Sequence, residues 1–169
     1  MRAVVLRLGL VAAVLFGGCR DGTSAEEGSI AGLYSAAVRW LVEEANEGES
    51  PAPERVFIEA VGEEGIPLEV QAEVVSQLKD VISVRFIDAR EEAIVIDEPG
   101  DPIRDGGVLL GLGDVTDIDR SPVRLYADRY RDVYDVVAYE LLFDRRGGTW
   151  QVTGEPREVP VENDRGLGG

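Results

Sequence analysis

The residues that could do chemistry in this chain are limited first by the residues that it lacks. The 169 residues include a single cysteine, Cys19, and no histidine. Ser-His-Asp and Cys-His catalysis both need an imidazole as the general base, and most zinc sites use histidine or several cysteines. The composition therefore excludes these classes of site, and the sequence indicates no cofactor.

Cys19 stands directly after a short apolar run near the N-terminus. Arg2 and Arg7 give the start of the chain a positive charge, and residues 8–16 are apolar apart from one glycine. A positive start, a short apolar core and small residues before a cleavage point are typical of a secretory signal peptide. A membrane-spanning helix would need about 20 predominantly apolar residues, and this run is shorter.

The stretch Phe16-Gly17-Gly18-Cys19 resembles the lipobox of bacterial lipoproteins, in which an aliphatic residue and two small residues precede a cysteine. Phenylalanine stands here where leucine is commonest, and glycine occupies the next position. The resemblance implies thioether lipidation of Cys19 and cleavage between Gly18 and Cys19. An ordinary signal peptide that happens to end near Cys19, or a cytoplasmic protein, is the alternative.

Lipidation would decide where the protein resides. Each lipid methylene buried in a membrane contributes roughly 0.8 kcal/mol to membrane affinity, and two or more chains make the anchoring stable. The resemblance therefore implies an exported protein, held by lipid at the outer face of the cytoplasmic membrane or at another envelope membrane. Its membrane contact would be made through the lipid anchor.

The charge balance bears on the other partners. The chain has 33 acidic and 17 basic residues, which gives a formal net charge of −16. Such a surface repels nucleic acid phosphates and anionic lipid headgroups. We expect no nucleic acid partner, and we expect the folded domain to stand off from the lipid surface.

One acidic run, Asp114, Asp117 and Asp119, resembles a calcium loop superficially, and a generic surface calcium site is the alternative to a solvated turn there. Asp117, Asp119 and Ser121 match positions one, three and five of a calcium loop. Position six is then Pro122 rather than glycine, and position twelve is Asp128 rather than glutamate, so the EF-hand pattern fails. The sequence favours a solvated turn here and predicts no metal site.

Tyrosine and arginine are enriched between residues 124 and 139. The alternation of Val123, Leu125 and Ala127 with polar residues predicts a strand in which Arg124, Tyr126 and Tyr130 share one face. Exposed aromatic residues beside arginine suit a contact with an envelope protein or a glycan. These three residues form the candidate interaction patch. The alternative is that the tyrosines cover the sheet edge with their hydroxyl groups in water.

Two helices and a series of strands are needed to position these residues. Apolar periodicity predicts a helix over 29–45 and a second helix that begins at Pro67. In the second helix we expect one buried face, made of Leu68, Ala72, Val75, Leu78 and Ile82. Strands are predicted over 55–61, 83–88, 107–115, 123–128, 135–144 and 149–152, with a short strand at 93–96 inside an acidic, irregular segment.

This order of elements predicts an α+β fold, with two helices packed on one face of a curved, mainly antiparallel sheet of about five strands. The chain divides into a signal peptide (1–18), a lipidated cysteine with a flexible tether (19–28), a single α+β domain (29–157) and a disordered tail (158–169).

The closing element, Leu141 to Val152, is a long strand, a Gly-Gly turn and a Trp-x-Val strand. It resembles the end of many NTF2-like domains, and the resemblance implies a cone-shaped cavity inside the sheet. Two functions follow as hypotheses. The first is a non-enzymatic binding domain anchored at the cell envelope. The alternative is a small-ligand carrier, or an enzyme that uses Asp or Glu as acid and base in an NTF2-like pocket.

Overall fold

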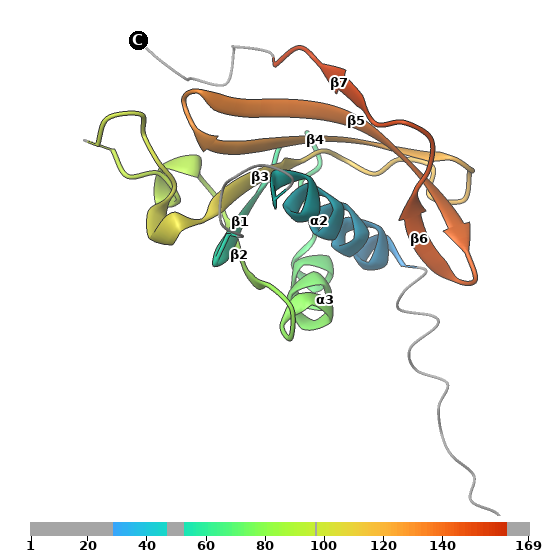
Figure 1. Ribbon diagram of the computed structural model, residues 1–169. Coiled ribbons are helices and arrows are strands. Elements are labelled where there is room, and N and C mark those ends of the chain that lie inside the picture. The colour runs from blue at the N-terminus through green and yellow to red at the C-terminus, as the bar shows by residue number, and fades with distance from the viewer. Residues whose placement is uncertain (1–28, 47–52, 97, 162–169) are drawn as a thin grey trace, which may run out of the picture.

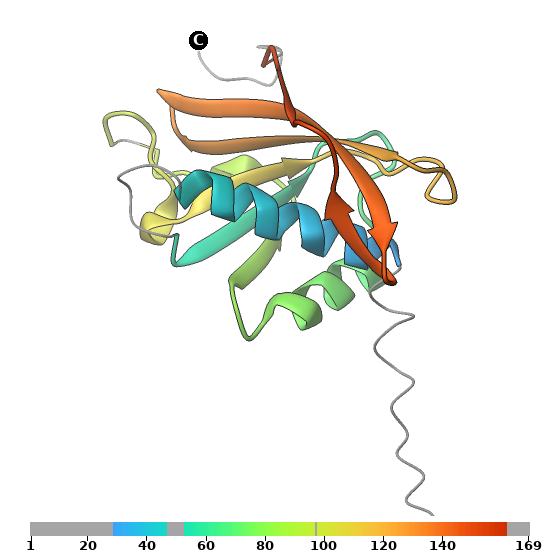
Figure 2. The same ribbon diagram turned by 45° about the vertical axis from the view of Figure 1, so that its right-hand side comes forward.

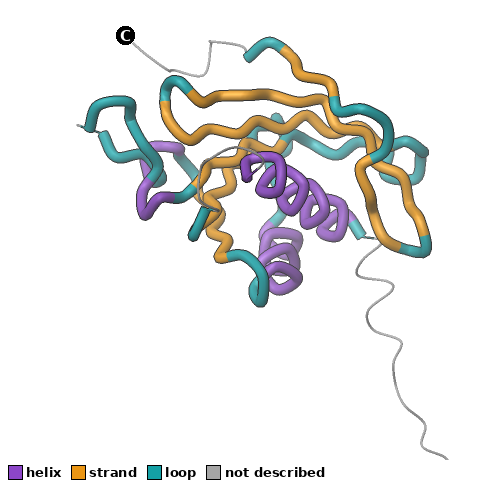
Figure 3. The backbone as a smooth tube through the Cα atoms, viewed as in Figure 1, coloured by secondary structure: helices purple, strands orange, loops and turns teal. Residues whose placement is uncertain are grey.

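The structure is a computed structural model that describes residues 29–46, 53–96 and 98–161. These residues form two α-helices, two short 3-10 helices and seven strands (Figure 3). In chain order the elements are α2 (Ile30–Asn46), β1 (Arg55–Ala60), α3 (Leu68–Leu78), β2 (Ser83–Ile87), η1 (Arg90–Glu92), η2 (Arg104–Gly106), β3 (Val108–Leu112), β4 (Val123–Asp132), β5 (Asp135–Arg146), β6 (Thr149–Val152) and β7 (Arg157–Val159).

The strands form one mixed sheet in the order β2-β1-β3-β4-β5-β6, and β7 pairs with β5. Strand β1 runs parallel to both β2 and β3, whereas the pairs from β3 onward are antiparallel. The sheet curls around α2, and α3 packs beside α2 on the same side (Figures 1 and 2). The predicted α+β architecture is confirmed, and the described part of the sheet has seven strands where about five were expected.

The main core lies between the helices and the curled sheet. Alternate residues of the strands point toward α2, because successive side chains of a strand point to opposite faces. The fully buried side chains include Leu41 of α2, Leu110 of β3, Leu125 of β4 and Phe143 of β5. This cluster extends across the sheet from β1 to β6, so it binds the parallel and the antiparallel strands into one unit.

A second, smaller core lies on the opposite face of the sheet. Phe57 of β1, Leu109 of β3 and Tyr130 of β4 point to that face. The segment that contains η1 and η2 covers them with Ile94 and Ile103, which also form an isolated β-bridge with each other. The strand predicted at 93–96 is therefore a single bridge in the segment that covers this part of the outer face.

The predicted buried face of α3 is wrong in part, because Leu78 is buried and Ile82 packs against the core but other members are exposed. Val74 and Leu78 are buried, whereas Leu68 is 78% exposed and Val75 is 36% exposed. Val70 packs against the core, so the true face has a spacing of four residues along the helix. The helix carries apolar residues on two sides, and its connections to β1 and β2 determine which side meets the sheet.

The C-terminal boundary of the domain also differs from the expectation. Glu158 and Val159 belong to β7, where the sequence predicts the start of the tail. Strand β7 pairs with β5 through Ala138 opposite Val159. A strand of three residues is too short to leave a periodic signal in the sequence. Residues 162–169 of the predicted tail lie outside the described residues.

Candidate interaction sites

The predicted patch lies on the outer face of the β4–β5 hairpin. Val123, Leu125 and Ala127 are buried toward α2, so Arg124 and Tyr126 point the other way. The antiparallel register places Tyr126 opposite Glu140 of β5. The structure therefore brings Arg124 and Tyr126 together, and it adds a carboxylate that the sequence had not singled out.

Glu140 is the centre of a small polar network on this face. Its Oε2 accepts a hydrogen bond from the Tyr126 hydroxyl at 2.8 Å and another from Arg157 Nη2 of β7 at 3.0 Å. Arg124 Nη1 lies 3.6 Å from the same oxygen. We call Arg124, Tyr126, Glu140 and Arg157 the Glu140 network. It joins β4, β5 and β7.

The network keeps Glu140 ionised. The hydrogen bond from Tyr126, followed by the charges of Arg124 and Arg157, lowers the pKa of Glu140 below its ordinary value. A general acid needs a pKa raised toward the working pH. The arrangement thus suits a fixed negative charge flanked by two guanidinium groups, which is a recognition feature rather than a proton donor.

Tyr130 lies on the predicted face of β4 but is 0% exposed. The segment with η1 and η2 covers this end of the sheet, and the Tyr130 hydroxyl donates a hydrogen bond to the carbonyl oxygen of Asp101 at 3.0 Å. Burial raises its pKa, and the nearby Asp101 raises it further. Tyr130 is thus part of the second core, while Tyr126, at 49% exposure, can contact a partner.

A second exposed surface lies beside α3 and was missed by sequence reasoning. Strand β2 is at the end of the sheet, and a shallow depression of about 320 Å³ lies between it and the C-terminal end of α3. Val75, Val81 and Val84 are among its lining residues. Leu68 and Val75 are apolar and exposed, but their helical spacing in the sequence predicts a buried face.

The acidic turn before β4 pairs its carboxylates with neighbours. Asp117 Oδ2 lies 3.1 Å from Arg120 Nη1, and Asp114 Oδ2 accepts a hydrogen bond from the Glu64 backbone N–H at 3.3 Å. Within the described ranges, no group of three or more acidic or cysteine side chains is placed to hold a metal ion.

The interior between the helices and the sheet is filled with side chains. Tyr34 of α2 is buried there, and its hydroxyl donates a hydrogen bond to the carbonyl oxygen of Gly113 at 3.0 Å. Burial, with a contribution from Asp114, raises the pKa of Tyr34 to about 12. The cone-shaped cavity implied by the NTF2-like resemblance would occupy this region, and the carrier or enzyme alternative stays a prediction.

The first described residue, Ser29, is held firmly to the domain. Trp150 Nε1 of β6 donates a hydrogen bond to the Ser29 carbonyl oxygen at 3.0 Å, and the Ser29 hydroxyl donates one to Glu73 Oε1 of α3 at 3.0 Å. The same hydroxyl accepts the backbone N–H of Gly32, which caps α2. Gly18 and Cys19, the predicted cleavage and lipidation residues, lie outside the described residues.

Comparison with known proteins gives no relative from which a function could be transferred. No protein-family model, curated protein or solved structure matches this chain. Among the described residues, neither α-helix has the length and apolar character needed to cross a membrane.

Proposed function

We propose that the protein is an exported lipoprotein whose α+β domain binds a partner at the cell envelope. The feature that carries the proposal is Cys19 in its lipobox-like context, followed after ten residues by Ser29. Because Trp150 and Glu73 fix Ser29 to the domain, the segment between Cys19 and Ser29 sets the distance between lipid and domain.

That distance is short. An extended chain spans at most about 3.5 Å per residue, so ten residues reach about 35 Å. A domain of this size has a diameter of the same order. The start of the domain at Ser29 thus lies within about one domain diameter of the membrane, and the binding surface lies within about two. A partner at this distance would be an envelope protein or a glycan.

The Glu140 network is the surface that we assign to this contact. It offers an exposed tyrosine ring and two guanidinium groups in a fixed arrangement on a rigid hairpin. Tyrosine and arginine are enriched at binding hot spots, and tyrosine buries a large area at a small cost in conformational entropy.

Lipidation is tested by labelling cells with a fatty-acid analogue. The wild-type protein should carry the label and Cys19→Ser should not. In a matched control, Cys19→Ser is combined with Ser24→Cys, which moves the thiol by five residues and should leave the protein unlabelled. Equal labelling of the wild type and Cys19→Ser would refute the lipoprotein assignment.

Partner binding is tested by cross-linking in intact cells. Arg124→Ala combined with Tyr126→Ala should remove the cross-linked species that the wild-type protein forms. Arg120→Ala is the control, because Arg120 is also exposed but lies in the preceding turn, where it pairs with Asp117. An unchanged cross-linked species in the double variant would remove the Glu140 network from the proposal.

A further inference from the structure

Strand β2 forms an edge of the sheet. It pairs with β1 on one side, and among the described residues no strand pairs with it on the other. An edge strand presents a row of N–H and C=O groups that can pair with another chain. Ser83 and Arg85 are exposed and Val84 is half-buried, so this edge is accessible.

Exposed apolar side chains lie on α3 and in the turn that leads from α3 to β2. Leu68 and Val75 lie on the side of α3 that flanks the buried face formed by Val74 and Leu78. Val81, in the turn between α3 and β2, is 72% exposed. Leu68, Ala72 and Val75 lie on one side of α3. We call these three residues, together with Val81, the α3 stripe.

The depression connects the stripe to the strand edge. Val75 lines it from the helix, Val81 and Ile82 line it from the connection to β2, and Val84 lines it from the strand. A segment laid along β2 would thus place every second side chain over apolar surface, since alternate residues of a strand point to the same face.

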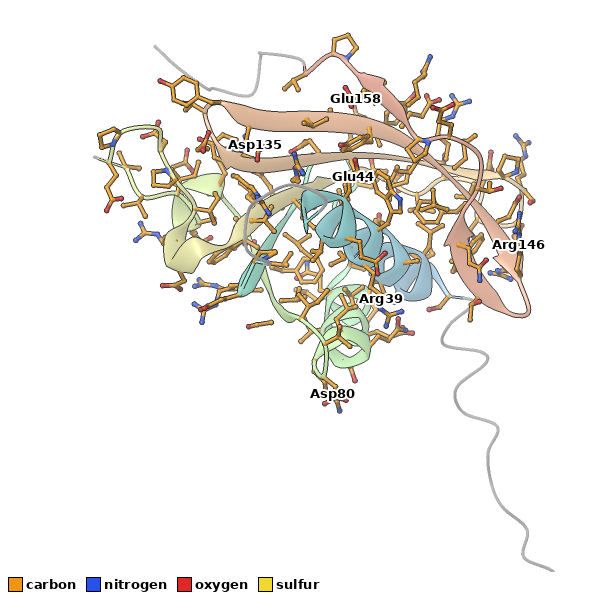
Figure 4. All side chains as sticks on the ribbon, viewed as in Figure 1. Arg39, Glu44, Asp80, Asp135, Arg146 and Glu158 are labelled. Atoms are coloured by element: carbon orange, nitrogen blue, oxygen red, sulfur yellow. The ribbon has the colours of Figure 1, made fainter. Side chains whose placement is uncertain are left out.

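The charges around this surface favour a basic occupant. Glu69 and Asp80 lie at the two ends of α3, and Asp88 and Glu91 follow β2. Figure 4 shows Asp80 projecting at the end of the helix. Arg85 of β2 is paired with Glu92 at 2.9 Å. Lys79 is the one basic residue among those that line the depression.

A second copy of this chain would bring the same acidic groups against each other. With a net charge of −16 on each chain, such a contact would also work against the overall repulsion of the two molecules. A segment with lysine or arginine at its ends would instead find carboxylates at both ends of β2.

From this we infer that the edge of β2 and the α3 stripe bind an extended segment of a partner protein, which adds to the sheet as a further strand. The segment is apolar at alternate positions and carries lysine or arginine at both ends. Backbone hydrogen bonds would supply affinity, and the depression would select the side chains. This surface is separate from the Glu140 network, and its binding does not depend on Cys19.

The test uses the purified full-length protein and the synthetic peptide KKVTVTVTKK. We expect saturable binding, measured by fluorescence anisotropy, together with slower amide hydrogen exchange over 83–87. The peptide EEVTVTVTEE, of the same length and alternation, should bind at least about tenfold more weakly. Added salt should weaken the binding of the lysine peptide, because exposed charges are screened.

A matched pair of variants locates the binding surface. Val81→Ser should weaken binding of the lysine peptide about tenfold, whereas Val133→Ser in the β4–β5 turn should leave it unchanged. Both valines are exposed, so both variants should fold.

Three outcomes would overturn the inference. The first is no binding at peptide concentrations up to about 1 mM, and the second is equal binding of the two peptides. The third is a concentration-dependent dimer that protects 83–87 from exchange in the absence of peptide, because the occupant would then be a second copy of the chain. Failure of fatty-acid labelling at Cys19 would leave the inference standing.

Discussion

The face of the sheet that α2 covers and the outer face are built from the same strands but differ in what they contribute. On the covered face, residues such as Leu125 and Phe143 are fully buried. On the outer face, the buried apolar cluster lies under the segment that contains η1 and η2, and the β4–β5 hairpin carries the Glu140 network. Stability should therefore depend mainly on one face and partner recognition on the other.

The largest effect is expected from a comparison of two adjacent residues of β5 whose side chains point to opposite faces of the sheet. Phe143→Ala removes a fully buried ring and should lower the free energy of unfolding by about 3–5 kcal/mol. Leu142→Ala, on the half-buried outer side, should cost about 1 kcal/mol or less. Urea denaturation measures both, and equal losses would contradict the division of roles between the faces.

A smaller effect separates the two ends of the outer face. Tyr130→Phe leaves the Asp101 carbonyl without its buried hydrogen bond and should cost about 1–2 kcal/mol. Tyr126→Phe removes an exposed hydrogen bond and should change the free energy of unfolding by less than about 0.5 kcal/mol. If Tyr126→Phe were the more destabilising variant, the covering segment would not form the second core.

Ser35 tests how completely the covered face is filled. It is buried in α2, and its hydroxyl oxygen has no hydrogen-bond partner. Ser35→Ala should stabilise the protein by about 1 kcal/mol, because the cost of burying that hydroxyl disappears. Ser76 is exposed on α3, so Ser76→Ala changes mainly helix propensity and should raise the free energy of unfolding by no more than about 0.5 kcal/mol. A loss of stability in Ser35→Ala would mean that the hydroxyl makes a stabilising contact.

The covered face should also respond to alkali through Tyr34. Because its folded-state pKa is raised from 10 to about 12, its contribution is fully present below pH 10 and is lost as the pH rises toward 12. We expect the free energy of unfolding to fall over this window, and Tyr34→Phe should reduce the slope. Part of the slope should remain in this variant, because burial also raises the pKa of Tyr139. An unchanged slope in Tyr34→Phe would contradict the burial of this hydroxyl.

The outer face should respond to acid instead, with the smallest effect of the five. The pKa of Glu140 is lowered from its ordinary value of 4.5 in the folded protein. Its stabilising contribution is therefore present above pH 4.5 and is lost as the pH falls through the folded-state pKa. Glu140→Gln should flatten this part of the profile. NMR titration of the Glu140 carboxyl gives the pKa directly, and an unshifted value would contradict the network.

The sequence predicts the elements of this fold well because each strand and helix has its own apolar pattern. The helix expected over 29–45 is α2, and the strands expected over 135–144 and 149–152 are β5 and β6. Their packing into two helices on one face of a curved sheet follows from the need of each apolar face to be covered.

Local patterns could not reveal which elements meet over long distances in the chain. The parallel pairing of β1 with β3 joins Val56 to Val108 across more than fifty residues, and periodicity does not encode that choice. The burial of Tyr130 and the exposure of Val75 have the same origin. Each depends on which distant segment covers the face on which the residue lies.

Only part of the Glu140 network could be predicted, because its other members come from distant parts of the chain. Alternation along β4 placed Arg124 and Tyr126 on the correct face. Glu140 and Arg157 join them through the pairing of β5 with β4 and with β7. Local sequence patterns do not predict these pairings. The β2 edge was overlooked because the apolar residues beside it suit a buried helix face equally well in sequence.

The placement of the two tryptophans gives the protein an internal optical reporter. The Trp40 ring of α2 meets Tyr139 of β5 edge to face, with centroids 5.1 Å apart. Trp150 of β6 is bound to the carbonyl that begins α2 and has the Arg145 guanidinium 4.5 Å from its ring centroid. Both indoles bridge the helix and the sheet, so their fluorescence would shift if α2 moved away from the sheet. No residue of β7 takes part in these contacts, so emission spectroscopy would report undocking of the helix more directly than fraying of β7.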